Sequence, residues 1–359
     1  MTIDFLIYKI ILVLIVFSIT LLVATYSTYA ERKIAAFLQD RIGPNRAGPF
    51  GILQPLADAV KMFMKEEVIP SVSNKILFII GPGLCMLTAC MTGVIIPWGK
   101  SINIGGVDYP LQIADVNIGI LYLFGVLSLG VYGIMIGGWA SNNKYSLLGA
   151  IRASSQMISY EVAMGISIIA LVMMTGTLST GEIAAQQGVG KLWGIFDTPS
   201  FNWNVFYQPL GCLIFIICAF AETNRAPFDL PECETELVGG YHTEYSSMKL
   251  GLFLFAEYIN MFISSAVIAT FYFGGYNMPL IGRWVHDPNW LAILGFVFLF
   301  MKIVGFIFLF MWVRWTLPRF RYDQLMNLGW KILIPLSIFN LIITGAVMMR
   351  HEIITYFFK

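Results

Sequence analysis

Residues 291–313 read LAILGFVFLFMKIVGFIFLFMWV, a run in which Lys302 is the only charged side chain. A helix rises about 1.5 Å per residue, so a run of this length spans the roughly 30 Å hydrocarbon core of a bilayer. The chain holds further long apolar runs, and the full set lies at 6–29, 76–98, 116–139, 154–176, 205–221, 247–273, 291–313 and 331–349. Within lipid, only a helix satisfies every backbone N–H and C=O inside one segment. We therefore expect eight transmembrane helices and no transmembrane strands.

The composition agrees with this pattern. Hydrophobic residues make up 58% of the chain and charged residues 12%, whereas about a quarter of an average soluble domain is charged. The sequence predicts an all-α polytopic membrane protein in which residues 1–359 form a single integral membrane domain.

Cations gather in alternate connections between the runs. The first, third and last connections carry Arg32, Lys33, Arg41, Arg46, Lys61, Lys65, Lys75, Lys144, Arg152, Arg314, Arg319 and Arg321. The intervening connections on the opposite side hold one cation each, at Lys100, Lys191 and Arg283. Because basic connections remain in the cytoplasm, we expect both termini on the outer face of a bacterial cytoplasmic membrane.

The first basic connection, residues 31–75, has structure of its own. Its segment RIGPNRAGPFG, residues 41–51, places Gly and Pro where they favour a compact series of turns. From residue 53 onward, apolar residues recur at helical spacing, opposite polar ones. This pattern predicts a short amphipathic helix that lies in the membrane interface, packs on the protein's own surface, or does both.

Residues 221–245 read AETNRAPFDLPECETELVGGYHTEY and combine six acids with one cation, Arg225. Crowded carboxylates raise one another's pKa, because each negative charge disfavours the next ionisation. Such groups exchange protons near neutral pH, which ordinary surface carboxylates do not. The stretch 221–246 is therefore a candidate site for proton chemistry in a cytoplasmic loop. The alternative is a solvated acidic loop.

Three formal charges fall inside the apolar runs and more than four residues from either end, at Glu161, Glu257 and Lys302. Each costs about 2.5–3.5 kcal/mol at the centre of a membrane helix, so such residues usually mark a polar path or a buried pair. Glu257 and Lys302 could neutralise each other, which would be a structural role. Glu161 follows Gln156, Ser159 and Tyr160, and this polar surrounding favours a place in a proton path.

The sequence offers no redox centre of its own. Its five cysteines show no CxxC spacing, and its three histidines lie near the ends of the runs. Iron–sulfur clusters need grouped thiolates and haem needs an axial ligand, and nucleotide-binding motifs are absent as well. We expect no metal ligand set and no nucleic acid partner. Any electrons would have to come from another subunit.

Three long stretches carry a family resemblance: ERKIAAFLQDRIGPNRAGPFGILQPLADAVKMFMKE (31–66), AETNRAPFDLPECETELVGGYHTEY (221–245) and RWTLPRFRYDQLMNLGWK (314–331). Over essentially its full length the chain resembles the quinone-binding membrane subunit of respiratory complex I, the bacterial NADH:quinone oxidoreductase. Cys233 is a departure, since the family more often has Ala or Gly there.

The resemblance implies a subunit of an enzyme complex, with quinone (ubiquinone or menaquinone) as the substrate. It implies partners as well: a peripheral iron–sulfur subunit, antiporter-like membrane subunits and membrane lipid. It implies that the chain forms the quinone chamber and couples quinone reduction to proton translocation. The quinone-site and proton-path residues would be Glu31, Arg32, Arg41, Glu161, Glu222, Arg225, Asp229, Glu232, Glu234, Glu236, Glu244 and Glu257.

Two alternatives remain open at this stage. Buried Glu and Lys also suit a secondary proton or sodium antiporter, although we find no internal inverted repeat. The equivalent subunit of a membrane-bound hydrogenase-type complex would share the fold but work with ferredoxin or hydrogen and need no quinone.

Overall fold

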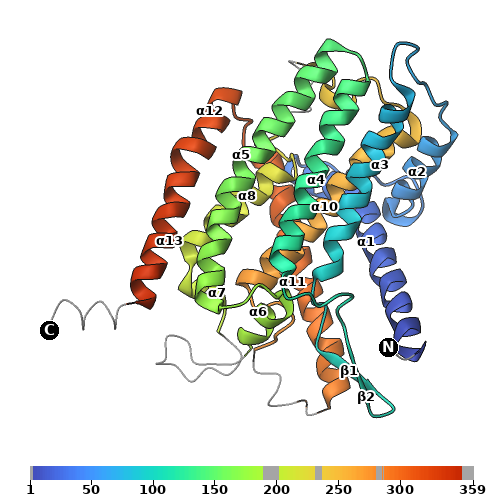
Figure 1. Ribbon diagram of the computed structural model, residues 1–359. Helices are drawn as coiled ribbons and strands as arrows, with labels where there is room; N and C mark the ends of the chain where they lie inside the picture. Colours follow the sequence, from blue (N-terminus) through green and yellow to red (C-terminus); the bar gives the residue numbers. More distant parts are fainter. Residues whose placement is uncertain (1–2, 189–201, 231–236, 280–284, 286, 350–359) are drawn as a thin grey trace.

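The computed structural model describes residues 3–188, 202–230, 237–279, 285 and 287–349 (Figure 1). Within these residues, seven helical segments are long and apolar enough to cross a membrane. Six of them are α1 (Ile3–Leu38), α3 (Lys75–Thr92), α4 (Gly119–Ala140), α5 (Lys144–Thr175), α10 (Ser247–Tyr272) and α11 (Pro288–Thr316). The seventh is a continuous segment of α12 (Tyr322–Asn327), the π-helical η5 (Leu328–Leu333) and α13 (Ile334–Met348). The predicted all-α polytopic fold is confirmed.

The run 205–221 differs from the other seven. It is divided between α7 (Asn204–Tyr207) and α8 (Pro209–Glu222), and Pro209 occupies the first turn of α8. The 14 residues of α8 rise only about 21 Å at about 1.5 Å per residue, less than a bilayer core of roughly 30 Å. The described residues thus contain seven full-length spans and one shorter apolar helix, where the sequence predicted eight spans.

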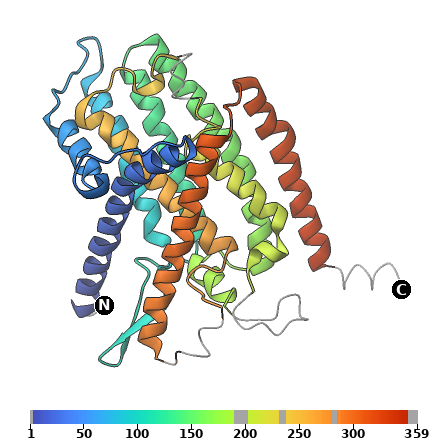
Figure 2. The ribbon, with the colours of Figure 1, turned by 180° about the vertical axis from the view of Figure 1, so that it is seen from behind.

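The helices form one bundle, with α1 and the α12–α13 segment at opposite edges (Figures 1 and 2). The most apolar part of α10 is 61% buried, against 17% for α1 and for the last segment. Helix α10 packs against α1, α3 and α11, while α5 packs against α4, α8 and α13. Helix α1 begins and α13 ends at the same end of the bundle (Figure 1).

Helices α3 and α4 approach closely because glycines face each other. A Cβ on Gly81 would lie 2.9 Å from Gly137 Cα, and one on Gly133 would lie 3.0 Å from the backbone nitrogen of Cys85. Small residues four apart permit such contacts between membrane helices. Asn74 and Asn143 cap the starts of α3 and α5 by accepting hydrogen bonds from backbone N–H groups.

A short hairpin joins α1 to α11 at the end where the chain begins. Strands β1 (Ser101–Ile104) and β2 (Val107–Pro110) pair antiparallel around Gly105 and Gly106, which both have positive φ. Tyr8 of α1 donates a hydrogen bond to the carbonyl of Pro110 at 3.0 Å. Asn103 and Asn289, at the start of α11, exchange backbone and side-chain hydrogen bonds of 2.7 and 2.9 Å. The hydropathy pattern did not predict this hairpin.

The predicted amphipathic helix is α2 (Gln54–Met64), preceded by the 3₁₀ turn η1 (Pro49–Gly51). Its apolar side chains are turned away from the protein, since Leu56, Val60, Phe63 and Met64 are 52–84% exposed. Its last turn is held by Ser247 of α10, whose hydroxyl lies 3.0 and 2.9 Å from the carbonyls of Met62 and Lys65. The apolar face therefore does not pack on the described part of the protein's own surface, and its place in the membrane interface stays a prediction.

The remaining described elements are short. They are η2 (Gly93–Ile95), α6 (Thr180–Gln186) and η3 (Gly240–His242).

Candidate functional site

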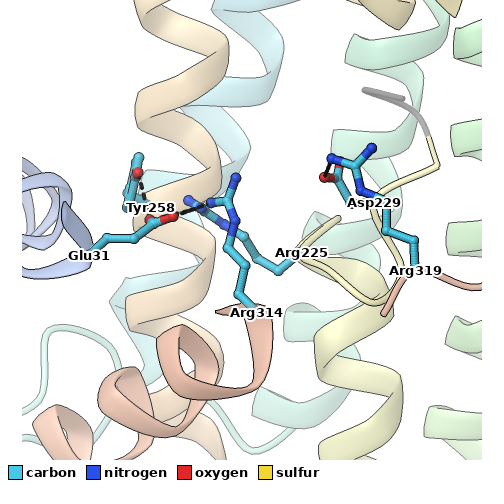
Figure 3. A network of polar contacts seen from close by, with 6 residues as sticks. All are labelled: Glu31, Arg225, Asp229, Tyr258, Arg314 and Arg319. Atoms are coloured by element: carbon cyan, nitrogen blue, oxygen red, sulfur yellow. Dashed lines mark hydrogen bonds and ion pairs between the residues drawn. The ribbon is translucent and has the colours of Figure 1, made fainter. Parts of the chain in front are cut away.

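Glu31 is the centre of a buried polar network near the end of α1 that is opposite the hairpin (Figure 3). Its Oε1 lies 2.6 Å from Nη1 of Arg314 and its Oε2 lies 3.1 Å from Nη1 of Arg225. The hydroxyl of Tyr258, on α10, donates to the same Oε2 at 2.8 Å. Through these three contacts Glu31 joins α1 to α10, α11 and the connection after α8. Hydrogen bonds to a charged group are stronger than neutral ones, so the contacts stabilise this junction.

Arg225 is held on two sides of its guanidinium group. Its carbon Cζ lies 4.2 Å from the centroid of the Tyr258 ring, in addition to the ion pair with Glu31. The side chains of Arg225 and Glu31 are only 4% and 7% exposed, whereas that of Arg314 is 26% exposed. A buried ion pair has to be closely fitted to offset the cost of removing both charges from water. Arg314 is thus the part of the network most open to an incoming molecule.

A second ion pair lies beside this network. Asp229, which is 3% exposed, accepts a hydrogen bond of 2.9 Å from Nη2 of Arg319. The segment after α11 packs on the connection after α8, with Phe320 N–H donating to the carbonyl of Pro227 at 3.2 Å. Arg225 is therefore not the only cation that meets the acidic connection and its surroundings. Arg319 reaches Asp229, and Arg314 reaches Glu31 beside it, from a part of the chain remote in sequence.

Glu222 and Glu257 line the same cavity, together with Thr223, Asn224, Tyr241 and Asn260. The volume open to the centres of water molecules is about 30 Å³, more than the roughly 10–15 Å³ that one water molecule needs. The Tyr241 hydroxyl donates to Glu257 Oε1 at 3.0 Å. Two carboxyl groups thus share a space that accommodates water between α3, α4, α8 and α10.

Glu161 lies on α5 opposite Ser128 of α4, and the Ser128 hydroxyl forms a short hydrogen bond with the Glu161 carboxyl group. Leu127, next to Ser128, lines the Glu222–Glu257 cavity. The structure therefore brings Glu161, Glu222 and Glu257 into one neighbourhood.

The polar residues that precede Glu161 do not surround it. Gln156 donates to the carbonyls of Ala221 and Phe228 at 2.8 and 2.9 Å, and the Tyr160 hydroxyl donates to the carbonyl of Leu325 at 2.9 Å. Successive helix residues are about 100° apart, so neighbours in sequence point in different directions. The predicted polar surrounding of Glu161 is supplied by Ser128, while Gln156 and Tyr160 bind α5 to other elements.

The other predicted site residues lie farther out or beyond the described part of the chain. Arg32 pairs with Asp58 of α2 at 2.7 Å, and the exposed Arg41 donates to Gln39. Glu244 accepts a hydrogen bond of 2.6 Å from the side chain of Asn143, near the start of α5. Glu232, Glu234 and Glu236 lie outside the described residues.

Lys302 does not pair with Glu257. Its ammonium group donates to the carbonyls of Phe273 and Gly275, at 2.6 and 2.7 Å, just beyond the end of α10. Glu257 is some 16 residues earlier on the same helix, a rise of about 24 Å. The pairing that the sequence left open is thus excluded by distance along α10. Lys302 instead compensates the negative end of that helix.

Residues 10–345 match the family model described as NADH dehydrogenase. The chain belongs to this family. It is similar to an NADH-quinone oxidoreductase H subunit of Cytophaga hutchinsonii, with 68% identity over 344 residues, covering 96% of this chain and 97% of the relative. It is 62% identical over 352 residues to the NADH-quinone oxidoreductase H subunit of Flavobacterium johnsoniae, covering 97% of each chain. "NADH-quinone oxidoreductase subunit 8" of Rhodothermus marinus is 46% identical over 329 residues, covering 90% of this chain and 92% of the relative.

Membership in the NADH dehydrogenase family places the chain among the subunits of an enzyme complex, respiratory complex I. Its partners are other subunits of that complex, and its apolar helices make it a multi-pass inner-membrane protein. Among the residues that the structure describes, no group of three or more His, Cys, Asp or Glu side chains is placed to bind a metal ion.

Four residues of the site were not among the predicted site residues: Arg314, Arg319, Tyr258 and Ser128. Both arginines belong to the stretch 314–331 that carried the family resemblance, so they could have been found there. Tyr258 follows Glu257 directly, but nothing in the sequence shows that its hydroxyl reaches Glu31. Ser128 sits in an apolar run in which a single hydroxyl gives no signal.

Proposed function

We propose that this subunit binds the quinone head group beside Glu31 and couples quinone reduction to proton translocation. The observation that carries the proposal is the Glu31 network, in which two arginines and a tyrosine meet one buried carboxylate. A quinone carbonyl oxygen accepts hydrogen bonds, and guanidinium and phenol groups can donate them. The partly exposed Arg314 pairs with Glu31, and the half-exposed Arg319 pairs with Asp229 beside the network (Figure 3).

Quinone reduction consumes protons at the head group, so a quinone site needs titratable groups within reach. Glu31 and Asp229 lie in the site, and Glu222 begins the connection that carries Arg225. We assign Glu222 and Glu257, with water in their shared cavity, to the next part of the proton path. Glu161 continues it, with the Ser128 hydroxyl as its partner.

Other residues of the acidic connection enter the proposal from the sequence. Glu232, Glu234 and Glu236 belong to the same short segment as Asp229, and we assign them to the mouth of the site. Arg32 and Arg41 would lie near the entrance formed by α1, α2 and α10, where the apolar face of α2 meets lipid. Glu244 would help to fix the connection against α5.

The electrons would come from a peripheral iron–sulfur subunit docked on the connections that contain Glu31, Arg225 and Arg319. Antiporter-like membrane subunits would receive the coupled proton movement through the α4–α5 side. The basic connections would face the cytoplasm and both termini the outer side, as the cation distribution indicates. The relatives' names favour a quinone oxidoreductase over a hydrogenase-type complex or a secondary antiporter.

The proposal is tested by Glu31→Gln in membranes that contain the assembled complex. Glutamine keeps the shape of the side chain but removes the charge shared by Arg225 and Arg314. We expect NADH:quinone reductase activity to fall at least ten-fold, about 1.4 kcal/mol in the barrier, while NADH oxidation by ferricyanide is retained. Glu182→Gln, an equivalent change at an exposed position on α6, should leave both activities unchanged. Normal quinone reduction by Glu31→Gln would refute a role for the network.

A further inference from the structure

A second buried polar cluster lies at the opposite end of α8 from Glu222. It consists of Gln208, immediately before α8, Tyr272, the last residue of α10, and Asn340 of α13. Their exposed fractions are 2%, 0% and 6%. Three side chains with polar atoms are thus enclosed where three helices meet.

One polar atom from each of these residues points at the same place. If Gly211 of α8 carried a Cβ, that atom would lie 3.0 Å from Gln208 Oε1, 3.1 Å from Asn340 Nδ2 and 3.6 Å from Tyr272 Oη. Within ordinary hydrogen-bond distances and angles, none of the three polar atoms has a partner among the described residues, although the Ser167 side chain lies near the Tyr272 hydroxyl. A glycine at this position keeps the three polar atoms clear of a methyl group, which would crowd Gln208 Oε1 and Asn340 Nδ2.

The orientation of the Gln208 amide is fixed by its other end. Its Nε2 donates to the carbonyl of Ala170 at 2.9 Å and lies 3.2 Å from Oγ1 of Thr344. A carbonyl can only accept, so the nitrogen is correctly assigned to that side and the oxygen Oε1 faces Gly211. The cluster therefore presents an acceptor from Gln208, a donor from Asn340, and a hydroxyl that can do either.

We propose that these three side chains bind one ordered water molecule next to Gly211. The water would donate to Gln208 Oε1, accept from Asn340 Nδ2, and use a remaining hydrogen or lone pair for Tyr272. A buried water molecule usually makes about three hydrogen bonds to polar groups that otherwise lack a partner. Since lipid offers no hydrogen bonds, buried polar groups in a membrane protein have to be satisfied internally.

This site is separate from the proposed proton path. Gly211 is 11 residues from Glu222 along α8, a rise of about 16 Å. The buried side chains of Ile214, Phe215 and Cys218 occupy the interval, and the Phe215 ring lies 5.7 Å from that of Tyr272. The water would instead bridge α8, α10 and α13, and so hold the peripheral α13 to the centre of the bundle.

The direct test is a cryo-electron microscopy map of the intact complex at a resolution that shows buried waters. We expect a peak within about 3.2 Å of Gln208 Oε1, Asn340 Nδ2 and Tyr272 Oη. The peak should persist in Gly305→Ala, where a Cβ would meet open space, and vanish in Gly211→Ala. A wild-type map without the peak, or with Gln208 and Asn340 bonded directly to each other, would overturn the proposal.

A second measurement uses heat stability of the purified complex. Gly211→Ala and Tyr272→Phe should each lower the temperature at which the subunit dissociates. The double variant should lose no more than the worse single one, because both changes remove the same water-mediated bridge. Additive losses would show that the two residues act independently, and would contradict a shared water. The wild-type map remains decisive if a variant fails to assemble.

Discussion

At the scale of single residues, the site depends on one carboxylate shared by partners that are far apart in sequence. Glu31 and Arg225 are separated by 194 positions, and Arg314 and Tyr258 come from two further helices. The family resemblance implied Glu31 as a site residue, and the acidic stretch 221–245 singled out Arg225 as its one cation. This pattern assigned the acids of residues 221–245 to Arg225 alone, since the arginines of the last connection become neighbours only in the folded chain.

Substitutions of Tyr258 can separate the contribution of its hydroxyl to quinone reduction from the contribution of its ring. Tyr258→Phe removes the 2.8 Å hydrogen bond to Glu31 but retains the ring that lies against Arg225. A hydrogen bond to a charged group is worth about 1.5–3 kcal/mol, so we expect kcat/KM for quinone to fall about ten-fold or more in the assembled complex. Tyr258→Leu removes the ring as well and should be worse. Equal kinetics for Tyr258→Phe and the wild type would mean that the ring alone matters.

At the scale of helices, the hydropathy pattern predicted the positions of the seven long spans. It did not predict the hairpin between two of them or the shortening of the helix in the run 205–221. Lipid requires long apolar helices, so the seven full spans could be predicted from run length alone. The run 205–221 is as apolar as the others, but Pro209 starts a new helix within it. The β1–β2 hairpin was missed because only the pair Gly105–Gly106 signals its turn, and its partners on α1 and α11 are remote in sequence.

The junction between α10 and α11 depends on Lys302. Its ammonium group donates hydrogen bonds to backbone carbonyls just beyond the end of α10 and lies 4.2 Å from the centroid of the Phe298 ring. Lys302→Leu leaves those carbonyls without their donor in a membrane, where no water replaces it. At about 1.5–3 kcal/mol per hydrogen bond to a charged group, we expect a stability loss of at least about 2 kcal/mol.

The loss can be measured as the yield of intact complex after graded heating in detergent. Met301→Leu changes the neighbouring residue, whose side chain is 65% exposed, and should behave as the wild type does. Equal heat resistance of Lys302→Leu would show that the ammonium group does not hold α10 to α11.

At the scale of the whole molecule, the two ends of the bundle differ in chemistry. The end of α1 that carries Glu31 and helix α2 lie at one end, while the hairpin, the start of α1 and the end of α13 lie at the other (Figure 1). The sequence predicted this division from the distribution of cations. It could not predict that Glu222 and Glu257 line one cavity, or that Glu161 pairs with Ser128 beside it, because both depend on how α4, α5, α8 and α10 pack.

Orientation in the membrane can be tested with cysteines introduced at exposed positions. Asn45→Cys lies in the connection before α2, and Asp108→Cys lies in the hairpin. Since basic connections stay in the cytoplasm, an impermeant thiol reagent should label Asn45→Cys only in inside-out vesicles and Asp108→Cys only in right-side-out vesicles. The parent protein gives the background from its own five cysteines. The reversed labelling pattern would place the Glu31 network on the outer side and contradict the proposed docking of an electron donor.

The central claim is that quinone reduction at the Glu31 network drives protons through the carboxyl groups around the cavity. It is tested most directly by Glu161→Gln in the assembled complex reconstituted into sealed vesicles. Glutamine keeps the hydrogen bond to Ser128 possible but cannot take up or release a proton. We expect NADH:quinone electron transfer and proton pumping to fall together, each at least ten-fold, with Glu161→Asp retaining part of both and Glu182→Gln retaining all. Normal rates with a normal ratio of protons to electrons in Glu161→Gln vesicles would contradict the proton path.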